Sequence, residues 1–137
     1  MLTQLSVFVE NKPGSFRHVT EVLHANAICV QAFCSVDSPE FGILRLVVDQ
    51  PEAAKACLEK EGFMTKDYDV LAVELSEQKP LPALLAACCE SNINILYMYS
   101  AYGDNGGRTA VIFYAEYLDE TEAMLKGKGF DCLDSLS

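Results

Sequence analysis

The fold of this 137-residue chain is decided in the stretch Ser6-Val-Phe-Val-Glu-Asn-Lys-Pro-Gly-Ser-Phe-Arg-His-Val-Thr-Glu-Val-Leu23. Apolar residues alternate from Leu5 to Val9, which is typical of a β-strand with one buried face. After Asn11-Lys-Pro-Gly14 the apolar spacing becomes helical, and it places four side chains on one face: Phe16, Val19, Val22 and Leu23. The stretch therefore predicts a strand, a turn and an amphipathic helix.

The same order of patterns returns roughly 66 residues later, which indicates an internal repeat. Alternation recurs from Leu71 to Leu75, and a proline-containing loop follows at Gln78-Lys-Pro80. The second helical face consists of Leu81, Leu84, Leu85 and Cys88. Matching phrases, Asn26-Ala-Ile-Cys-Val30 and Ser91-Asn-Ile-Asn-Ile95, then open a β-rich part of each half.

Each β-rich part is interrupted by turn-forming residues and therefore predicts a hairpin. The turn formers are Asp37-Ser-Pro-Glu40 with Gly42 in the first half and Gly103-Asp-Asn-Gly-Gly107 in the second. The returning strands are expected at Ile43 to Val48 and at Thr109 to Ala115.

A second helix and a short final strand complete each half. The helices are expected at Glu52 to Glu61 and at Asp119 to Lys126. Glycine follows each helix, as Gly62 or Gly129, at a position where a left-handed cap is favoured. In the first half the closing strand is expected at Thr65 to Tyr68.

Two units of β-α-β-β-α-β order predict an α+β protein made of two ferredoxin-like repeats. Each repeat is expected to form an antiparallel sheet with its helices on one face. The expected domains are residues 1–69 and residues 70–137.

Composition narrows the classes of function. Twenty acidic residues against ten basic ones give a net charge of -10, which repels phosphate backbones and anionic lipid surfaces. We therefore expect neither nucleic acid nor membrane as a partner. The segment Met1 to Glu10 has no basic flank and no long apolar run, so a cytoplasmic protein is expected.

The main alternative to a binding protein is a thiol enzyme or a metal site. The six cysteines lie in apolar stretches without Cys-x-x-Cys spacing, which favours buried, reduced thiols. His18 and His24 are six residues apart, so on a helix they project roughly 240° apart and cannot share a metal ion. A nucleophilic cysteine needs an adjacent base and positively charged surroundings, whereas Cys88 and Cys89 lie on an apolar helix of an acidic protein. We therefore expect no catalytic residue, no metal and no cofactor.

The stretch Ser6 to Leu23 resembles the opening of ACT domains, in particular those of the regulatory subunits of acetolactate synthase. In that family a strand ends in a Glu-Asn-x-Pro-Gly phrase and a helix begins directly after it, as at Glu10 to Gly14 here. The likeness covers nearly the whole chain as two ACT-like repeats. It implies a regulatory protein that binds an amino acid at an interface between ACT units.

The resemblance implies a ligand site made from the loop before the first helix and the start of the second strand. The residues that it indicates in this chain are Asn11, Lys12, Pro13, Gly14, Ser15, Phe16, Cys29, Val30, Asn92, Asn94 and Ile95. Amide groups at a helix N-terminus can hold a carboxylate without a basic side chain, which makes this location physically reasonable.

The two halves differ in the residues that would contact a ligand. Related ACT domains often carry Asn on the second strand where this chain has Cys29, a weaker hydrogen-bonding group. Asn94 occupies that place in the second half, but the loop Ser76 to Pro82 lacks the glycine. One hypothesis is that the loop Asn11 to Phe16 faces the strand Asn92 to Ile95 across an intramolecular or dimer interface.

These observations predict a regulatory protein whose effector is an amino acid, which forms a homodimer and modulates a partner enzyme of amino acid metabolism. Exposed sheet edges favour pairing with a second copy. A ligand-free dimerisation or adaptor module remains an alternative, beside the thiol enzyme and the metal-binding protein.

Overall fold

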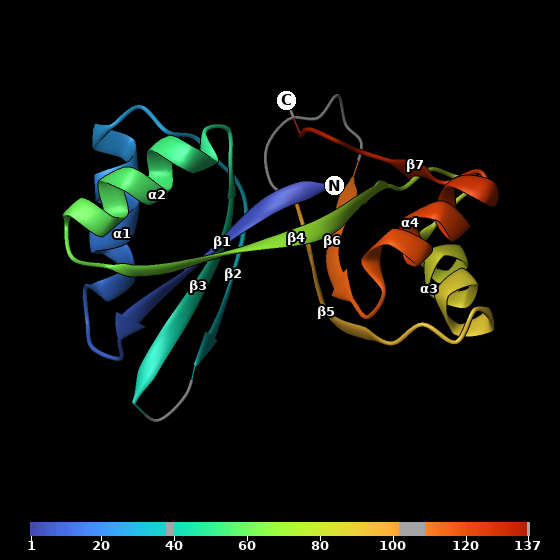
Figure 1. The fold of residues 1–137 in the computed structure, drawn as a ribbon, viewed down its shortest axis with the longest axis horizontal. Coiled ribbons are helices and arrows are strands. Elements are labelled where there is room, and N and C mark those ends of the chain that lie inside the picture. The colour runs from blue at the N-terminus through green and yellow to red at the C-terminus, as the bar shows by residue number, and fades with distance from the viewer. Residues whose placement is uncertain (38–39, 102–108, 137) are drawn as a thin grey trace. The chain divides into compact units, whose positions relative to one another are not determined.

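We analysed a computed structural model, which describes residues 1–37, 40–101 and 109–136. The chain divides into two compact units (Figure 1). One unit is Thr3–Tyr68, and the other combines Met1–Leu2 with Asp69–Ser137. The predicted turn at 103–107 and Tyr102 lie outside the described residues, as do Ser38 and Pro39 of the first predicted turn.

The first unit has the predicted order of elements. They are β1 (Leu2–Glu10), α1 (Ser15–Ala25), β2 (Val30–Asp37), β3 (Phe41–Val48), α2 (Pro51–Lys60) and the beginning of β4 (Met64–Glu74). β3 pairs antiparallel with both β1 and β2, and Val9 lies opposite Gly42. The strand order β2-β3-β1-β4 is that of a ferredoxin-like sheet.

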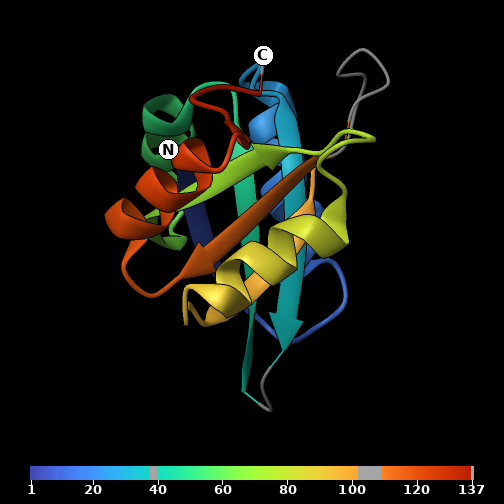
Figure 2. The ribbon, with the colours of Figure 1, turned by 90° about the vertical axis from the view of Figure 1, so that its right-hand side faces the viewer.

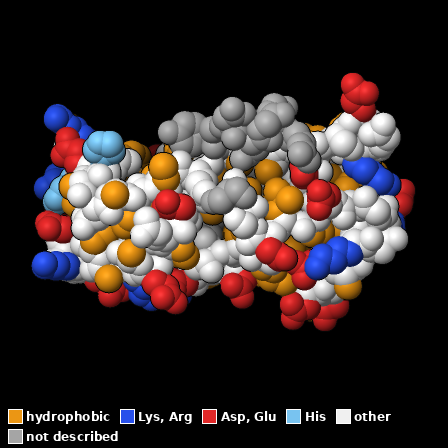
Figure 3. All heavy atoms as spheres, turned by 90° about the horizontal axis from the view of Figure 1, so that it is seen from above, with side chains coloured by type: hydrophobic (Ala, Val, Ile, Leu, Met, Phe, Trp, Pro, Cys, Tyr) orange, Lys and Arg blue, Asp and Glu red, His pale blue; other side chains and the backbone are white. Residues whose placement is uncertain are grey.

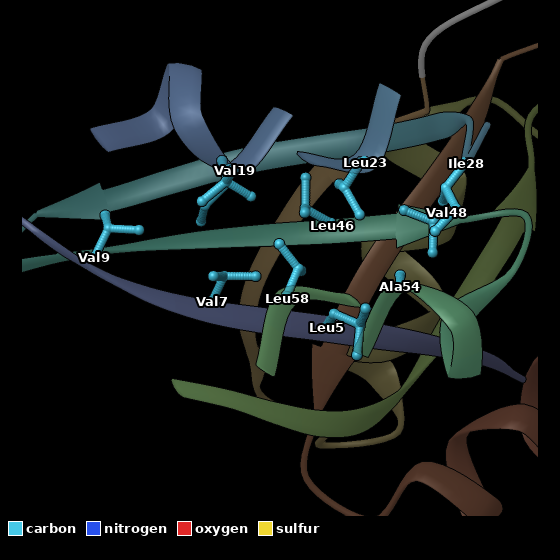
Figure 4. Close-up of a cluster of buried hydrophobic side chains, with 11 residues drawn as sticks. Leu5, Val7, Val9, Val19, Leu23, Ile28, Leu46, Val48, Ala54 and Leu58 are labelled. Carbon is cyan, nitrogen blue, oxygen red and sulfur yellow. The ribbon is translucent and has the colours of Figure 1, made fainter. Parts of the chain in front are cut away.

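The core of the first unit explains why the alternating and helical patterns occur together. Leu5 and Val7 of β1 point to the same side of the sheet as Leu46 of β3 (Figure 4). α1 covers this side with Val19 and Leu23, and α2 covers it with Ala54 and Leu58. Burial of each large aliphatic side chain stabilises the fold by about 1.5–3 kcal/mol relative to exposure.

The second unit repeats this arrangement. It contains the end of β4, α3 (Leu81–Glu90), β5 (Ile95–Ser100), β6 (Ala110–Ala115), α4 (Leu118–Gly127) and β7 (Asp131–Cys132). β6 pairs antiparallel with β4 and β5, and β7 pairs antiparallel with β4. α3 and α4 lie on the same side of these strands (Figure 2), and the core combines them with β4 and β6. The predicted fold class, two ferredoxin-like β-α-β-β-α-β repeats, is confirmed.

Three details differ from the sequence-based expectations. The strands expected at Thr65 to Tyr68 and Leu71 to Leu75 are one continuous strand, because neither glycine nor proline interrupts β4 between them. Phe16 and Leu85, which the helical spacing places on buried faces, are exposed, since each lies at the margin of its helix's apolar face. Burial is instead concentrated at Val19 and Leu23 of α1 and at Leu84, Ala87 and Cys88 of α3.

The predicted glycine caps are confirmed at both second helices. After α2, the Gly62 amide donates to the Glu59 carbonyl and the Phe63 amide donates to the Leu58 carbonyl, both at 3.0 Å. This is the Schellman pattern, and Gly62 has the positive φ (92°) that it requires. Gly129 has the same role after α4, with φ of 87°.

The first helices of the two units end with the same hydrogen bonds but without glycine. Ala27 (φ 57°) holds the left-handed position after α1, and Asn92 (φ 55°) holds it after α3. Asparagine tolerates this conformation because its short polar side chain bonds locally, whereas alanine is strained by about 1–2 kcal/mol.

Replacing Ala27 by glycine is therefore expected to raise the free energy of unfolding by about 0.5–1 kcal/mol, since relief of strain exceeds the extra entropy of the unfolded chain. Urea unfolding followed by circular dichroism measures the change. Ala56→Gly, at an exposed position inside α2, is the control and should lower stability by a similar amount. Equal losses in both variants would contradict the strain at Ala27.

Candidate ligand-binding site

The loop between β1 and α1 is a short structured turn. The Lys12 amide donates to the Glu10 carbonyl at 2.9 Å, and the Ser15 amide donates to the Lys12 carbonyl at 3.3 Å. Gly14 is the N-cap of α1 and has φ of 88°, a left-handed conformation that other residues adopt only with strain. The glycine of the Asn-Lys-Pro-Gly phrase is thus explained by the backbone of the turn.

Two amide groups at the start of α1 remain available to a ligand. Gly14 has no side chain that could cap the helix, and the His18 amide is the first to bond to a carbonyl of the turn in the α-helical manner. The Phe16 and Arg17 amides have no acceptor within the described part of the chain. Both amides lie at the N-terminus of α1, which is the positive end of the helix dipole. Such an arrangement binds carboxylates and other anions.

The corresponding helix of the second unit lacks this pair of donors. Pro82 occupies the second position of α3 and has no amide hydrogen. The Ala83 amide, at the third position, donates to the Pro80 carbonyl at 3.0 Å. The start of α1 therefore offers two donors to an anion, and the start of α3 offers neither.

The second predicted segment starts β2 in the first unit, where its backbone is already hydrogen-bonded. The Cys29 amide donates to Oδ1 of Asp49 at 2.9 Å, and the Asp49 amide donates to the Cys29 carbonyl at 3.2 Å. Val30 is half-buried at the beginning of the strand, opposite Val48. Cys29 is therefore left with only an exposed thiol to offer a ligand.

In the second unit the corresponding residue, Asn94, is more available. Its carbonyl accepts the Glu116 amide at 3.4 Å, but its exposed side-chain amide has no hydrogen-bond partner among the described residues. Asn92 instead serves as the left-handed cap of α3, and half-buried Ile95 starts β5 opposite Ala115. Of the Asn92 to Ile95 segment, Asn94 offers the side chain best suited to a ligand.

Within the first unit the loop and Cys29 lie at opposite ends of the sheet. They are separated by the 11 residues of α1, which span about 16 Å. Glu10, beside the loop, pairs with Phe41 at one end of β3, and Val30 pairs with Val48 at the other end. The first unit alone does not bring the two predicted segments into one site.

The six cysteines form no disulfide. All six are free, and burial raises the pKa of the Cys34, Cys88 and Cys132 thiols. The expectation that the cysteines are buried is correct for Cys88 but wrong for Cys29 and Cys89, which are exposed. Cys89 follows Cys88 on α3 and points away from the core face, because adjacent helical residues project about 100° apart. Raised pKa values keep thiols protonated at neutral pH, and a protonated thiol is a poor nucleophile.

Three further observations bear on metal binding, membrane insertion and surface charge. No group of three or more potential metal-ligating side chains occurs in residues 1–37, 40–101 and 109–136. None of the described helices combines the length and the apolar character needed to cross a bilayer. Acidic side chains are spread over the face shown in Figure 3, in keeping with the net charge of -10.

Two β-α-β-β-α-β units in tandem, with a glycine-capped helix after the first strand, define the class of tandem ACT-type proteins. The chain belongs to the ACT domain pair family, whose model matches residues 1–134. No curated protein matches the chain significantly.

Solved structures share this fold over most of their length. A protein from Bacteroides thetaiotaomicron is 32% identical, with a TM-score of 0.87 over 96% of this chain and 91% of its own. The regulatory subunit of aspartate kinase from Thermus thermophilus, in a ligand-free form, has a TM-score of 0.65 at 18% identity, over 92% of this chain and 91% of its own. The same subunit from Thermus flavus has a TM-score of 0.63 at 18% identity, over 92% and 90%.

Proposed function

We propose that this chain binds an amino acid through the β1–α1 loop and thereby regulates a partner enzyme of amino acid metabolism. The observation that carries the proposal is the pair of Phe16 and Arg17 amides at the start of α1, which lack an acceptor among the described residues. They supply the positive end of a helix to the ligand's carboxylate. The exposed side chain of Asn11 supplies an oxygen acceptor for its ammonium group.

The regulatory part of the proposal is supported by the family and by the fold shared with aspartate kinase regulatory subunits. Those subunits control an enzyme that acts on an amino acid, and the same role is proposed here. The narrower resemblance, to the regulatory subunits of acetolactate synthase, rests on the stretch Ser6 to Leu23 and does not identify a particular partner enzyme.

The second half of the ligand site is proposed to come from the Asn94 segment. The start of the second strand cannot reach the loop within the first repeat, so a complete site needs this segment from another repeat or another copy of the chain. The exposed side-chain amide of Asn94 has no hydrogen-bond partner among the described residues, whereas the Cys29 backbone is already bonded to Asp49. A homodimer is the proposed assembly.

Gly14→Asp is expected to weaken binding of the effector by about tenfold or more. The new carboxylate would accept the Phe16 and Arg17 amides as an N-cap and would exclude the carboxylate of the ligand. Isothermal titration with the amino acid that binds the wild-type protein measures the loss.

Gly62→Asp is the matched control, because Gly62 also has a positive φ (92°) and open space around its Cα. Both variants carry the same backbone strain, but only Gly14→Asp should lose affinity. Asn94→Ala should weaken binding about threefold to tenfold, the value of one hydrogen bond. Unchanged affinity in both Gly14→Asp and Asn94→Ala would exclude the proposed site.

A ligand-free adaptor is the second candidate function, and exposed apolar side chains favour it. Among the described strands β2 and β5 end the sheet order. Phe33 and Val36 of β2 and Leu96 and Met98 of β5 are exposed. Edge strands with apolar side chains are suited to pairing with another protein. An adaptor would therefore bind its partner through β2 or β5, without an effector.

A further inference from the structure

The Phe16 side chain is held beside the proposed carboxylate site. Its ring packs on Gly42 of β3, where an added Cβ would lie 3.4 Å from Cζ and 3.6 Å from Cε1 of the ring. Val9 closes the same spot, since its Cγ2 atom lies 3.5 Å from that Cβ position. One side of the ring is therefore supported by the sheet, and Gly42 leaves the room that the ring needs.

The ring is nevertheless 42% exposed. The Phe16 amide, one of the two available donors, is attached to the same Cα as this ring. For a ligand whose carboxylate binds that amide, the exposed part of the ring is the side-chain surface of the same residue. An apolar side chain would remove this surface from water, and a polar one would not gain from the contact.

The charged side chains around the loop are paired with one another. Lys12 Nζ lies 3.2 Å from Oε2 of Glu10, and Arg17 Nε donates to Oε1 of Glu21 at 2.7 Å. The next residue, His18, contacts the Phe63 ring, with ring centroids 5.0 Å apart. Among the described residues of the loop and the first turn of α1, both cationic side chains, Lys12 and Arg17, are therefore already paired with carboxylates.

We infer that the Phe16 ring selects effectors with a neutral, apolar side chain at this site. The inference rests on the proposed function, because it assumes that an amino acid binds at the start of α1. It extends that function by naming the class of amino acid and the residue that selects it. The second repeat has Pro82 at the corresponding helix position and offers no such ring.

Titration of the full chain with leucine, serine and lysine tests the inference. The wild-type protein should bind leucine about tenfold more tightly than serine or more, the range expected for loss of apolar contacts in a binding pocket. Phe16→Ala should reduce that preference to about threefold or less and leave the affinity for serine nearly unchanged, while Phe16→Leu should retain the preference.

Two further variants control for altered folding. Phe33→Ala removes a ring on β2 that is 52% exposed and should keep the leucine preference. Gly42→Val displaces the ring while Phe16 remains, and it should reduce the preference as Phe16→Ala does. A leucine preference that survives Phe16→Ala, or a preference for lysine in the wild type, would overturn the inference but not the proposed function. Failure of every amino acid to bind the wild type would overturn both.

Discussion

Phe113→Ala is expected to lower the free energy of unfolding by about 3–5 kcal/mol, the largest effect on stability predicted for this chain. Phe113 lies on β6, opposite Leu71 of β4 and Met98 of β5, and its side chain is fully buried. Truncation would leave a cavity that the surrounding strands and helices cannot fill. Urea unfolding measures the loss.

Phe33→Ala makes the same chemical change at a phenylalanine that is 52% exposed. Its effect should be about 1 kcal/mol or less, because little surface is buried there. Similar losses in the two variants would mean that Phe113 is not at the centre of the core.

Addition of the effector at a hundredfold excess over its Kd is expected to stabilise the folded chain by about 2.7 kcal/mol, because it binds only the folded state. For a chain of this size the rise in Tm should be roughly 5–15 °C. A thermal-shift screen against the twenty amino acids measures it, and the shift should fall to about half or less in Gly14→Asp but persist in full in Gly62→Asp. A protein that forms a clean dimer yet responds to no amino acid would favour the adaptor.

The fold could be predicted because its local signals agree with one another. Alternation at Leu5 to Val9, helical spacing at Val19 to Leu23 and glycine at Gly62 and Gly129 each indicate the element that forms there. The repeat reinforces each of these signals by presenting it twice. Periodicity did not show how far burial extends along a helix, so it placed the exposed Phe16 on a buried face.

The candidate site was less predictable because the residue types did not reveal their hydrogen bonds. Cys29 differs from Asn94 in its side chain, but the bond from its amide to Asp49 depends on where two distant segments meet. Asn92 is a left-handed cap because it follows the end of α3. The phrase Ser91 to Ile95 matches its counterpart in the first half only in spacing, and spacing does not reveal this role. The sequence did contain one unused signal: Pro82 has no amide hydrogen to offer an anion.

Under the proposed function, that proline also bears on the shape of the expected binding curve. The donor pair at the start of α1 has no counterpart at the second and third positions of α3, so the proposed function gives a single chain one carboxylate site although its fold is duplicated. A protein with one site per chain shows a hyperbolic dose response unless copies of it influence one another. A sigmoidal response would therefore reveal communication between chains, and the internal repeat by itself would not make the response steeper.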